Sequence, residues 1–221
     1  MPEIEADARP RALVIVAHPE PASFGWVVAK ETIRGIKDAG SEADIADLAS
    51  EGFDPRISAA DLAHYLGTAG LPNDVRREQA RIDAADALIL VFPVFWWSMP
   101  ALLKGWIDRV FTSGWAYRVA ADGTVEGGLR DCPERLLATG AGDGPGYDKH
   151  GYRAAIATQI EHGTLAFSGL HDVETHLLYD VESADASVRA AHLRTAYNVG
   201  RRPFGIASRA RDTAATLPPG E

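Results

Sequence analysis

Cysteine is nearly absent from this chain of 221 residues, with Cys132 as its single instance. One thiol cannot form a disulfide within the chain, so a disulfide framework is excluded and a reducing compartment, the cytoplasm, is expected. Long apolar runs are missing too, since none approaches the roughly 20 residues of a membrane-spanning helix. Residues 1–11 are polar and acidic and lack the apolar segment of a signal peptide. We therefore expect no membrane insertion.

Positive charge is also scarce. The chain has 22 Lys and Arg against 31 Asp and Glu, a formal net charge of −9, and no block of basic residues. This balance argues against nucleic acid and anionic membranes as partners. Of the seven histidines, His171 and His176 would face opposite sides of a strand, and no metal-ligand pattern is present, so we expect no metal site.

The length predicts one domain over residues 1–221, with a core at about 11–201 and loose tails at 1–10 and 203–221. Apolar runs predict strands at residues 13–17, 45–48, 87–92, 136–139 and 173–179. Periodic segments predict helices at 23–39, 59–66, 74–84, 100–111, 152–165 and 183–201, and a hairpin at 117–125. Because the strong strands are continuous apolar runs that alternate with helices, we expect an α/β fold whose parallel sheet is covered on both faces.

The segment after the third predicted strand is the most informative. Its apolar run breaks at Pro93, Trp96 and Trp97 follow, and Pro100 opens an amphipathic helix. Open α/β sheets bind their ligands at the carboxyl ends of strands. Two adjacent tryptophans cannot both face a core from one extended segment, so the pair favours a flat, π-rich ligand over simple core packing.

This segment resembles the NAD(P)H dehydrogenase (quinone) family of flavodoxin-like flavoproteins. That family has a Pro-x-x-Trp-aromatic turn, then Pro-Ala-x-Leu-Lys-x-Trp, then Arg-Val-Phe, and each feature stands between Pro93 and Phe111. The resemblance extends from about Arg11 to Arg201. It implies a flavodoxin-like, doubly wound sheet of five parallel strands in the order 2-1-3-4-5, with flavin at the switch point. It also implies two-electron, ping-pong hydride transfer from NAD(P)H through FAD, or alternatively FMN, to quinones or similar electrophiles.

The first strand leads into a segment from His18 to Phe24 that lacks the Gly-x-Gly-x-x-Gly of NAD-binding folds. The following helix offers free N–H groups and the positive end of its dipole, which suit a phosphate. On the residues alone, Ser23 as a simple cap and His18 as a polar strand end are favoured. The resemblance instead implies that His18, Ser23 and Phe24 hold the flavin phosphates, with Gly25 where the family has Asn.

For the flavin ring, the resemblance implies contacts from the turn after the third strand, made mainly by backbone amides of Pro93, Val94, Phe95, Trp96 and Trp97. Trp97 would also form a wall of the substrate pocket. A second contact would come from the partly matching loop Thr139, Gly140 and Ala141, although a Gly-rich loop alone is a weak signal. Gln79 and Arg189 match positions that touch the distal part of FAD.

Tyr147 matches a family tyrosine that can bond the flavin or the quinone, and Arg153 stands where relatives have a histidine, with His150 nearby. Arg153 would balance anionic reduced flavin or, equally, form a surface salt bridge. Trp115 and Tyr117 would line the partner's substrate pocket in a homodimer with shared sites, or pack on their own subunit. One subunit cannot easily bury Trp106, Phe111 and Trp115, which also predicts a dimer.

Two other functions stay open. One is an electron carrier of the flavodoxin type, although a carrier has no need of a partner-facing hairpin. The other is a regulatory flavoprotein subunit of a membrane transporter.

Overall fold

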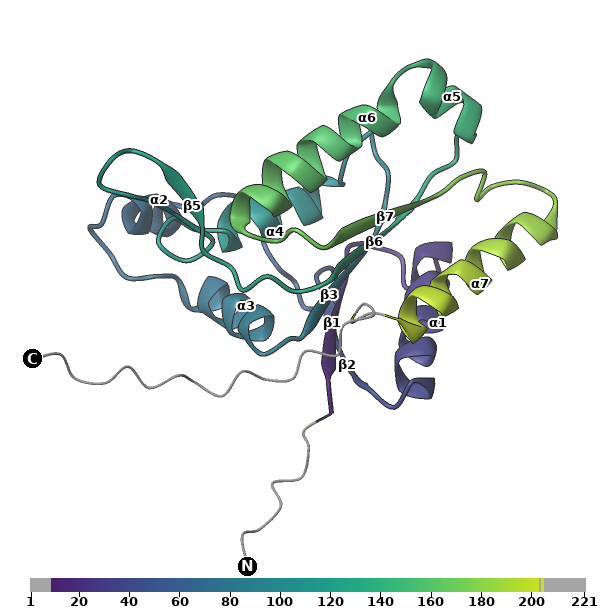
Figure 1. Cartoon of the computed structure of the whole chain (residues 1–221), viewed down its shortest axis with the longest axis horizontal. Coiled ribbons are helices and arrows are strands. Elements are labelled where there is room, and N and C mark those ends of the chain that lie inside the picture. Colours follow the sequence, from purple (N-terminus) through teal and green to yellow (C-terminus); the bar gives the residue numbers. More distant parts are fainter. Residues whose placement is uncertain (1–8, 203, 205–221) are drawn as a thin grey trace, which may run out of the picture.

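A parallel sheet of five strands forms the centre of the computed structural model, which describes residues 9–202 and 204 (Figure 1). Its strands are β1 (Arg11–Val16), β2 (Glu42–Asp47), β3 (Ala87–Pro93), β6 (Glu134–Thr139) and β7 (Val173–Leu178). They lie in the order β2-β1-β3-β6-β7, and every neighbouring pair is parallel. This order confirms the predicted doubly wound fold, in which the switch point lies between β1 and β3.

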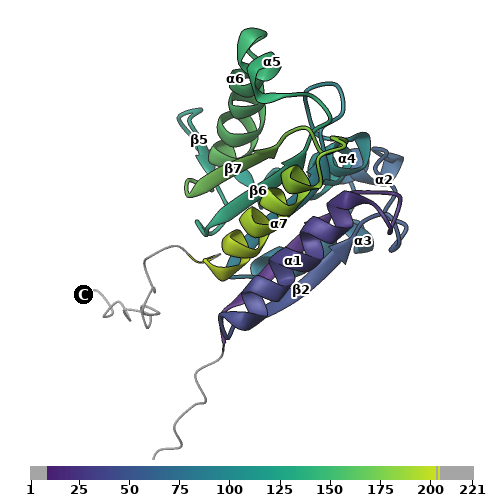
Figure 2. The ribbon, with the colours of Figure 1, turned by 90° about the vertical axis from the view of Figure 1, so that its right-hand side faces the viewer.

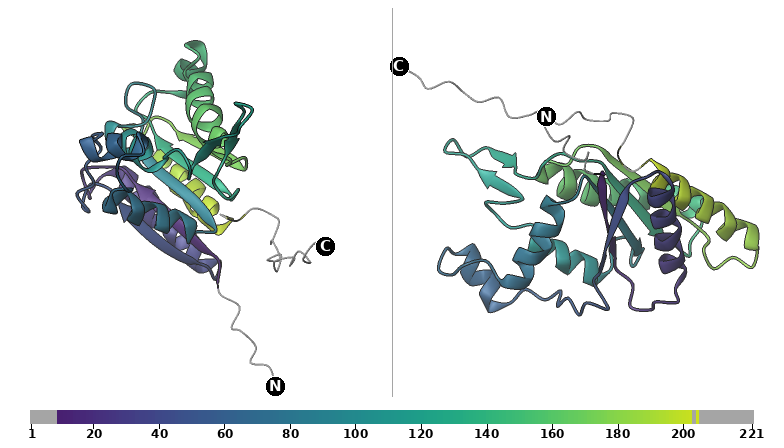
Figure 3. Two further views of the ribbon diagram at one scale, coloured as in Figure 1. Left: turned by 90° about the vertical axis from the view of Figure 1, so that its left-hand side faces the viewer. Right: turned by 90° about the horizontal axis from the view of Figure 1, so that it is seen from below.

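Helices cover both faces of the sheet. On one face α1 (Phe24–Asp38) and α7 (Ala186–Arg201) lie side by side (Figure 2). The other face carries α3 (Asn73–Asp83), α4 (Ala101–Val110) and the continuous helical segment of α6 (Tyr152–Ile156) and η1 (Ala157–Leu165) (Figure 3). Alternation of side chains along the strands separates the two cores. In β1, Leu13 and Ile15 face α4, whereas Val14 and Val16 face α1 and α7.

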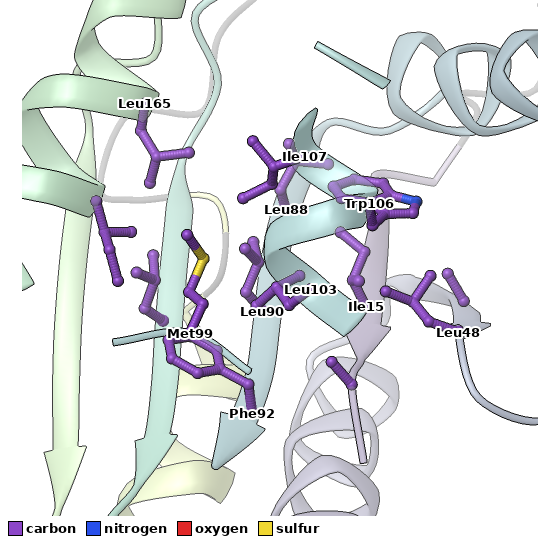
Figure 4. Packing of buried hydrophobic residues seen from close by; sticks show 14 of the residues in the cluster. Ile15, Leu48, Leu88, Leu90, Phe92, Met99, Leu103, Trp106, Ile107 and Leu165 are labelled. Carbon is purple, nitrogen blue, oxygen red and sulfur yellow. The ribbon is translucent and has the colours of Figure 1, made fainter. Parts of the chain in front are cut away.

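Trp106 of α4 lies in the larger core, beside Ile15, Leu88 and Leu103 (Figure 4). It is 1% exposed, and its indole N–H donates to the buried Glu78 at 3.2 Å. Arg81 also reaches this carboxylate at 3.2 Å, so the buried charge is compensated. Of the three aromatic residues predicted to need a second subunit, Trp106 is buried within one chain, where α3 supplies a polar partner for its N–H, while Phe111 and Trp115 are only partly buried.

The two helices on the other face touch through their backbones. A Cβ atom at Gly200 would lie 2.0 Å from the carbonyl oxygen of Thr32, and one at Gly35 would lie 2.2 Å from that of Tyr197. Both positions therefore require glycine for packing. This close approach packs α7 directly against α1.

Shorter elements complete the fold. They are α2 (Ala59–Tyr65), the hairpin strands β4 (Tyr117–Val119) and β5 (Val125–Gly127), α5 (Gly144–Lys149) and the short helix η2 (Ala166–Ser168). Two predictions differ from them. The loop expected after the fourth strand contains α5, because Asp143 caps that helix by accepting from the Gly146 N–H at 2.8 Å. The helix expected at 152–165 changes from α to π geometry at Ala157.

None of the helices within residues 9–202 is both long enough and apolar enough to cross a bilayer. The loose tails predicted for residues 1–10 and 203–221 fall almost wholly outside the described residues, so they stay a prediction.

Glu134, at the start of β6, is the one carboxylate of the described core whose two oxygens both lack a hydrogen-bond partner. Its side chain is fully buried. Burial, reinforced by the nearby Asp131 and opposed by Arg135, raises the pKa of Glu134 to about 8. The folded state therefore prefers the neutral acid at neutral pH.

We predict that Glu134→Gln stabilises the protein in a pH-dependent way. Because the folded-state pKa exceeds the ordinary value, ionisation costs folding free energy progressively between pH 4.5 and about pH 8. At about 1.4 kcal/mol per pH unit, the variant should gain a few kcal/mol over wild type at pH 8.5 and little at pH 4.5. Urea unfolding at both pH values measures this gain. A gain that is the same at both pH values would show that the pKa of Glu134 does not differ between the folded and unfolded states.

Candidate functional site

The loops that follow β1, β3 and β6 meet at the carboxyl edge of the sheet. Backbone hydrogen bonds join their first residues: the Ala17 N–H donates to the Val91 oxygen at 3.0 Å, and the Val94 N–H donates to the Thr139 oxygen at 2.8 Å. Parallel neighbours require this convergence, since their carboxyl ends lie at the same edge. The predicted phosphate, ring-edge and glycine-loop segments are therefore brought together.

The loop after β3 contains a tight turn at residues 95–98, here termed the tryptophan turn. Phe95 and Ser98 exchange both backbone hydrogen bonds, at 3.0 and 3.1 Å. Trp96 and Trp97 at its centre have φ values of +49° and +60°, a region that side chains other than glycine enter at a cost. Their N–H groups have no acceptor among the described residues. Trp96 is 91% exposed, as expected for an aromatic pair that does not serve the core.

The loop after β1 ends at the N-terminus of α1. Ser23 is the N-cap, accepting from the Trp26 N–H at 3.3 Å, which confirms the cap prediction. The Nδ1 atom of His18 accepts from the Glu20 N–H at 3.0 Å, so in the neutral ring Nε2 carries the proton and can donate. Phe24 and Gly25 occupy the first helical turn, where N–H groups have no intrahelical acceptor. A Cβ at Gly25 would meet nothing nearer than 3.8 Å.

The loop after β6 passes beneath Tyr147 of α5. The N–H groups of Ala141 and Gly142 donate to no acceptor in the described part of the chain. A Cβ at Gly140 would lie 2.8 Å from the Tyr147 hydroxyl, so this oxygen rests on the loop backbone. Burial, and secondarily Tyr179, raises the pKa of Tyr147, which keeps the phenol protonated as a donor.

Aromatic rings cluster over the tryptophan turn. Trp97 stacks on Tyr152, with centroids 3.7 Å apart and planes 6° apart, and meets Tyr147 edge-on at 5.5 Å. Tyr147 in turn contacts Tyr179 at 4.9 Å. The sequence analysis missed Tyr152 and Tyr179. Tyr152 precedes Arg153, and Tyr179 directly follows the fifth strand, a position where site residues are expected.

Arg153 forms an exposed ion pair with Asp148 at 2.8 Å, and its guanidinium lies 5.4 Å from the Tyr179 ring centre. The surface salt bridge, one of its two predicted roles, is thus present. Its partner Asp148 raises the pKa of Arg153, which therefore stays charged. His150 stacks on Tyr152 at 5.5 Å.

Gln79 and Trp115 both form hydrogen bonds within the chain. Gln79 is buried, and its amide nitrogen donates to the Val110 oxygen at 2.9 Å and to the Thr112 hydroxyl at 3.0 Å. This amide ties α3 to the end of α4, and the contact of Gln79 with the distal part of FAD stays a prediction. The Trp115 indole N–H donates to Asp83 at 3.3 Å, so this ring packs on its own subunit. Arg189 lies at the start of α7 and donates to the Ser183 oxygen.

Tyr117 of β4 packs against Phe167 of η2, with ring centres 5.4 Å apart. Phe167 is 46% exposed, and the sequence analysis did not single it out. A cavity of about 390 Å³ lies beside Tyr117, lined also by Asp61, Tyr65 and the buried Arg109. Apart from Tyr117, its lining includes none of the predicted site residues, so the cavity is separate from the tryptophan turn.

Comparison with known proteins agrees with this arrangement. The profile of the flavodoxin-like fold family matches residues 10–199. NAD(P)H dehydrogenase (quinone) 1 of Cavia porcellus is 33% identical over 198 residues, which cover 81% of this chain and 72% of that protein. The chain belongs to the NAD(P)H dehydrogenase (quinone) family of flavodoxin-like proteins. The resemblance drawn from the tryptophan turn and its flanking motifs is therefore confirmed.

Two further proteins extend the comparison. Ribosyldihydronicotinamide dehydrogenase (quinone) of Rattus norvegicus is 28% identical and covers 83% of this chain and 87% of its own length. The solved structure of an NAD(P)H:quinone oxidoreductase from Methanothermobacter marburgensis superposes with a TM-score of 0.81 at 28% identity, covering 88% of this chain and 98% of that one.

We predict that Gly140→Ala destabilises the protein through the Tyr147 hydroxyl. The added methyl would lie 2.8 Å from this oxygen but 3.6 Å from the nearest ring carbon, so the clash is with the hydroxyl. Overpacking of this kind costs about 1–3 kcal/mol. Adding Tyr147→Phe should remove most of the loss, and urea unfolding of both single variants and the double variant measures the coupling. If the changes in unfolding free energy of the two single variants simply add in the double variant, the contact between position 140 and the Tyr147 hydroxyl is contradicted.

Proposed function

We propose that the chain binds FAD, with FMN as the alternative, and transfers hydride from NAD(P)H to quinones or similar electrophiles in a two-electron, ping-pong reaction. The observation that carries the proposal is the set of unpaired backbone donors at the carboxyl edge. The N–H groups of Trp96, Trp97, Ala141 and Gly142 lack acceptors among the described residues, the rings of Trp96 and Trp97 are exposed, and the Tyr147 ring lies beside the loop of Ala141 and Gly142. Donors fixed in this way suit the carbonyl and nitrogen edge of a flavin ring.

The first loop fits the other end of such a cofactor. The opening N–H groups of α1 and the Nε2 proton of His18 provide donors for phosphate, and Ser23 retains its hydroxyl proton. Arg189 at the start of α7 is proposed to contact the distal part of FAD. A bound flavin would supply the two-electron chemistry, and the protein orients and polarises it.

Two side chains are proposed to act on the reacting groups. Tyr147 would donate its hydroxyl proton in a hydrogen bond to flavin or acceptor, since this group has no partner among the described residues. Arg153 would balance negative charge at the site from its place over Tyr179, although Asp148 already offsets part of its charge. Trp97 and the partner's copy of Tyr117 would line the pocket shared by nicotinamide and acceptor.

The β4–β5 hairpin favours an enzyme with shared sites over a flavodoxin-type electron carrier, which has no need of a partner-facing hairpin. The β4–β5 hairpin forms, and both residues of its cross-strand pair, Val119 and Val125, are exposed at 62% and 47%. Two apolar residues on one face of a short hairpin suit a protein contact. We propose that this hairpin, with Phe167, contacts a second copy of the chain in a cytoplasmic homodimer.

The proposed function predicts that the purified protein is yellow or takes up flavin stoichiometrically, and that it then oxidises NADH or NADPH with a quinone. Heat release and chromatography identify FAD or FMN. A protein that binds neither flavin would contradict the proposal. Flavin binding without quinone-dependent turnover would favour the carrier or regulatory function.

A matched pair of substitutions at Gly25 tests the phosphate end of the site. Because a Cβ fits there at 3.8 Å, Gly25→Asn should add one hydrogen bond and tighten flavin binding roughly three- to tenfold. Gly25→Leu has similar bulk but no donor and should not tighten it. Equal effects of the two variants would argue against a phosphate beside Gly25.

The proposed dimer predicts that light scattering reports twice the mass of one chain at micromolar concentration. Replacing both hairpin residues, Val119→Glu and Val125→Glu, places four like charges in the contact and should give monomers. Val27→Glu on α1, at a site 38% exposed, is the control and should leave the dimer intact. A wild-type monomer would contradict the shared-site proposal.

A further inference from the structure

Helix α6–η1 contacts the tryptophan turn at two points, neither of which the proposed function has used. Tyr152 stacks flat on Trp97 at 3.7 Å. Seven residues later, Gln159 accepts from the Ser98 hydroxyl at 3.5 Å, a long hydrogen bond. Both contacts come from the same helix and are made to Trp97 and Ser98, the second half of the turn.

The tryptophan turn needs support from outside itself. Trp96 and Trp97 both have positive φ, and neither is a glycine. The two hydrogen bonds between Phe95 and Ser98 close the turn but do not involve the N–H groups of its central residues. Residues in this region of φ persist where surrounding structure determines them.

The helix is suited to provide that support because it is anchored in the core. Ile156, Ile160 and Leu165 are buried at 2%, 0% and 0% exposure. The change to π geometry at Ala157 falls between the two contacts, and π segments often occur beside functional sites. Within the π segment the Thr164 hydroxyl donates to the backbone carbonyl oxygen of Gln159 at 2.8 Å. This bond fixes the backbone that carries the second contact.

We propose that Tyr152 and Gln159 are positioning residues that hold the tryptophan turn so that the N–H groups of Trp96 and Trp97 keep one direction. This inference rests on the proposed function, in which those groups face the flavin ring. Fixed donors favour the more negative, reduced ring over the oxidised one. The stack of Tyr152 on Trp97 therefore contributes to the tighter binding of reduced flavin than of oxidised flavin. It acts through Trp97, without contact between Tyr152 and the reacting atoms.

The matched pair Tyr152→Phe and Tyr152→Ala tests this role. The Tyr152 hydroxyl makes no hydrogen bond within the described residues, so Phe keeps the stack and Ala removes it. In Tyr152→Ala we expect reduced flavin to bind about three- to tenfold more weakly relative to oxidised flavin. A tenfold change lowers the two-electron midpoint potential by about 30 mV. Tyr152→Phe should keep the wild-type potential, and Gln159→Leu should lower it by a smaller amount.

The apoprotein provides a readout free of cofactor and of turnover. Near-ultraviolet circular dichroism should lose intensity in Tyr152→Ala and keep it in Tyr152→Phe, because the Trp97 ring loses its fixed neighbour. A wild-type potential in Tyr152→Ala together with a changed dichroism signal would overturn the inference, since the stack would then be purely structural. If wild type bound no flavin, the proposed function itself would fail, and this result is distinct from a failure of the positioning role.

Discussion

Complete burial of β3 is the constraint on which the site depends. All seven of its residues are buried, which is possible only if strands lie on both sides and helices lie on both faces. Its neighbours β1 and β6 therefore end beside it, and their loops must share one edge. The chain leaves β3 after Pro93, the last residue of the strand, and it has to turn back soon afterwards to place α4 over the sheet. The tryptophan turn results from that reversal.

The positive φ values of Trp96 and Trp97 cost conformational free energy, and they place two aromatic rings at the proposed site. A glycine at either central position would adopt positive φ without steric cost. The chain has two tryptophans there, which keep the exposed rings beside the donors but need contacts from α6–η1 to hold the conformation. Backbone donors without protein acceptors at an exposed edge remain free to bond a ligand, whereas buried ones are rare because each lost hydrogen bond costs free energy. Their concentration around one aromatic patch is thus the property that most clearly separates a ligand site from an ordinary strand–helix corner.

Local signals in the sequence, namely continuous apolar runs, the Ser23 cap and prolines at strand ends, predicted the elements and a parallel sheet, whereas the strand order and the site at the switch point came from the family resemblance. The sequence did not show which groups Gln79 and Trp115 bond within the chain, since their partners Val110 and Asp83 are 31 and 32 residues away. The spacing of apolar residues along a segment does not show which side chains so far apart in the sequence will form hydrogen bonds. Tyr152 was missed for the same reason. It lies 55 residues from Trp97, and its stack depends on how the helix leaves α5, which Asp143 determines through a cap inside a glycine-rich segment.

Two buried glutamates show why burial alone does not define a functional carboxylate. Glu78 and Glu134 are 1% and 0% exposed. Glu78 accepts from Trp106 and faces Arg81, so ionisation is compensated and the residue links α3 to α4. Glu134 has no such donor, and its raised pKa favours the neutral acid. Yet Glu134 begins β6, at the opposite end of that strand from Thr139 and the glycine loop. Its perturbation therefore affects stability, while the proposed chemistry lies at the carboxyl edge, where backbone N–H groups supply donors.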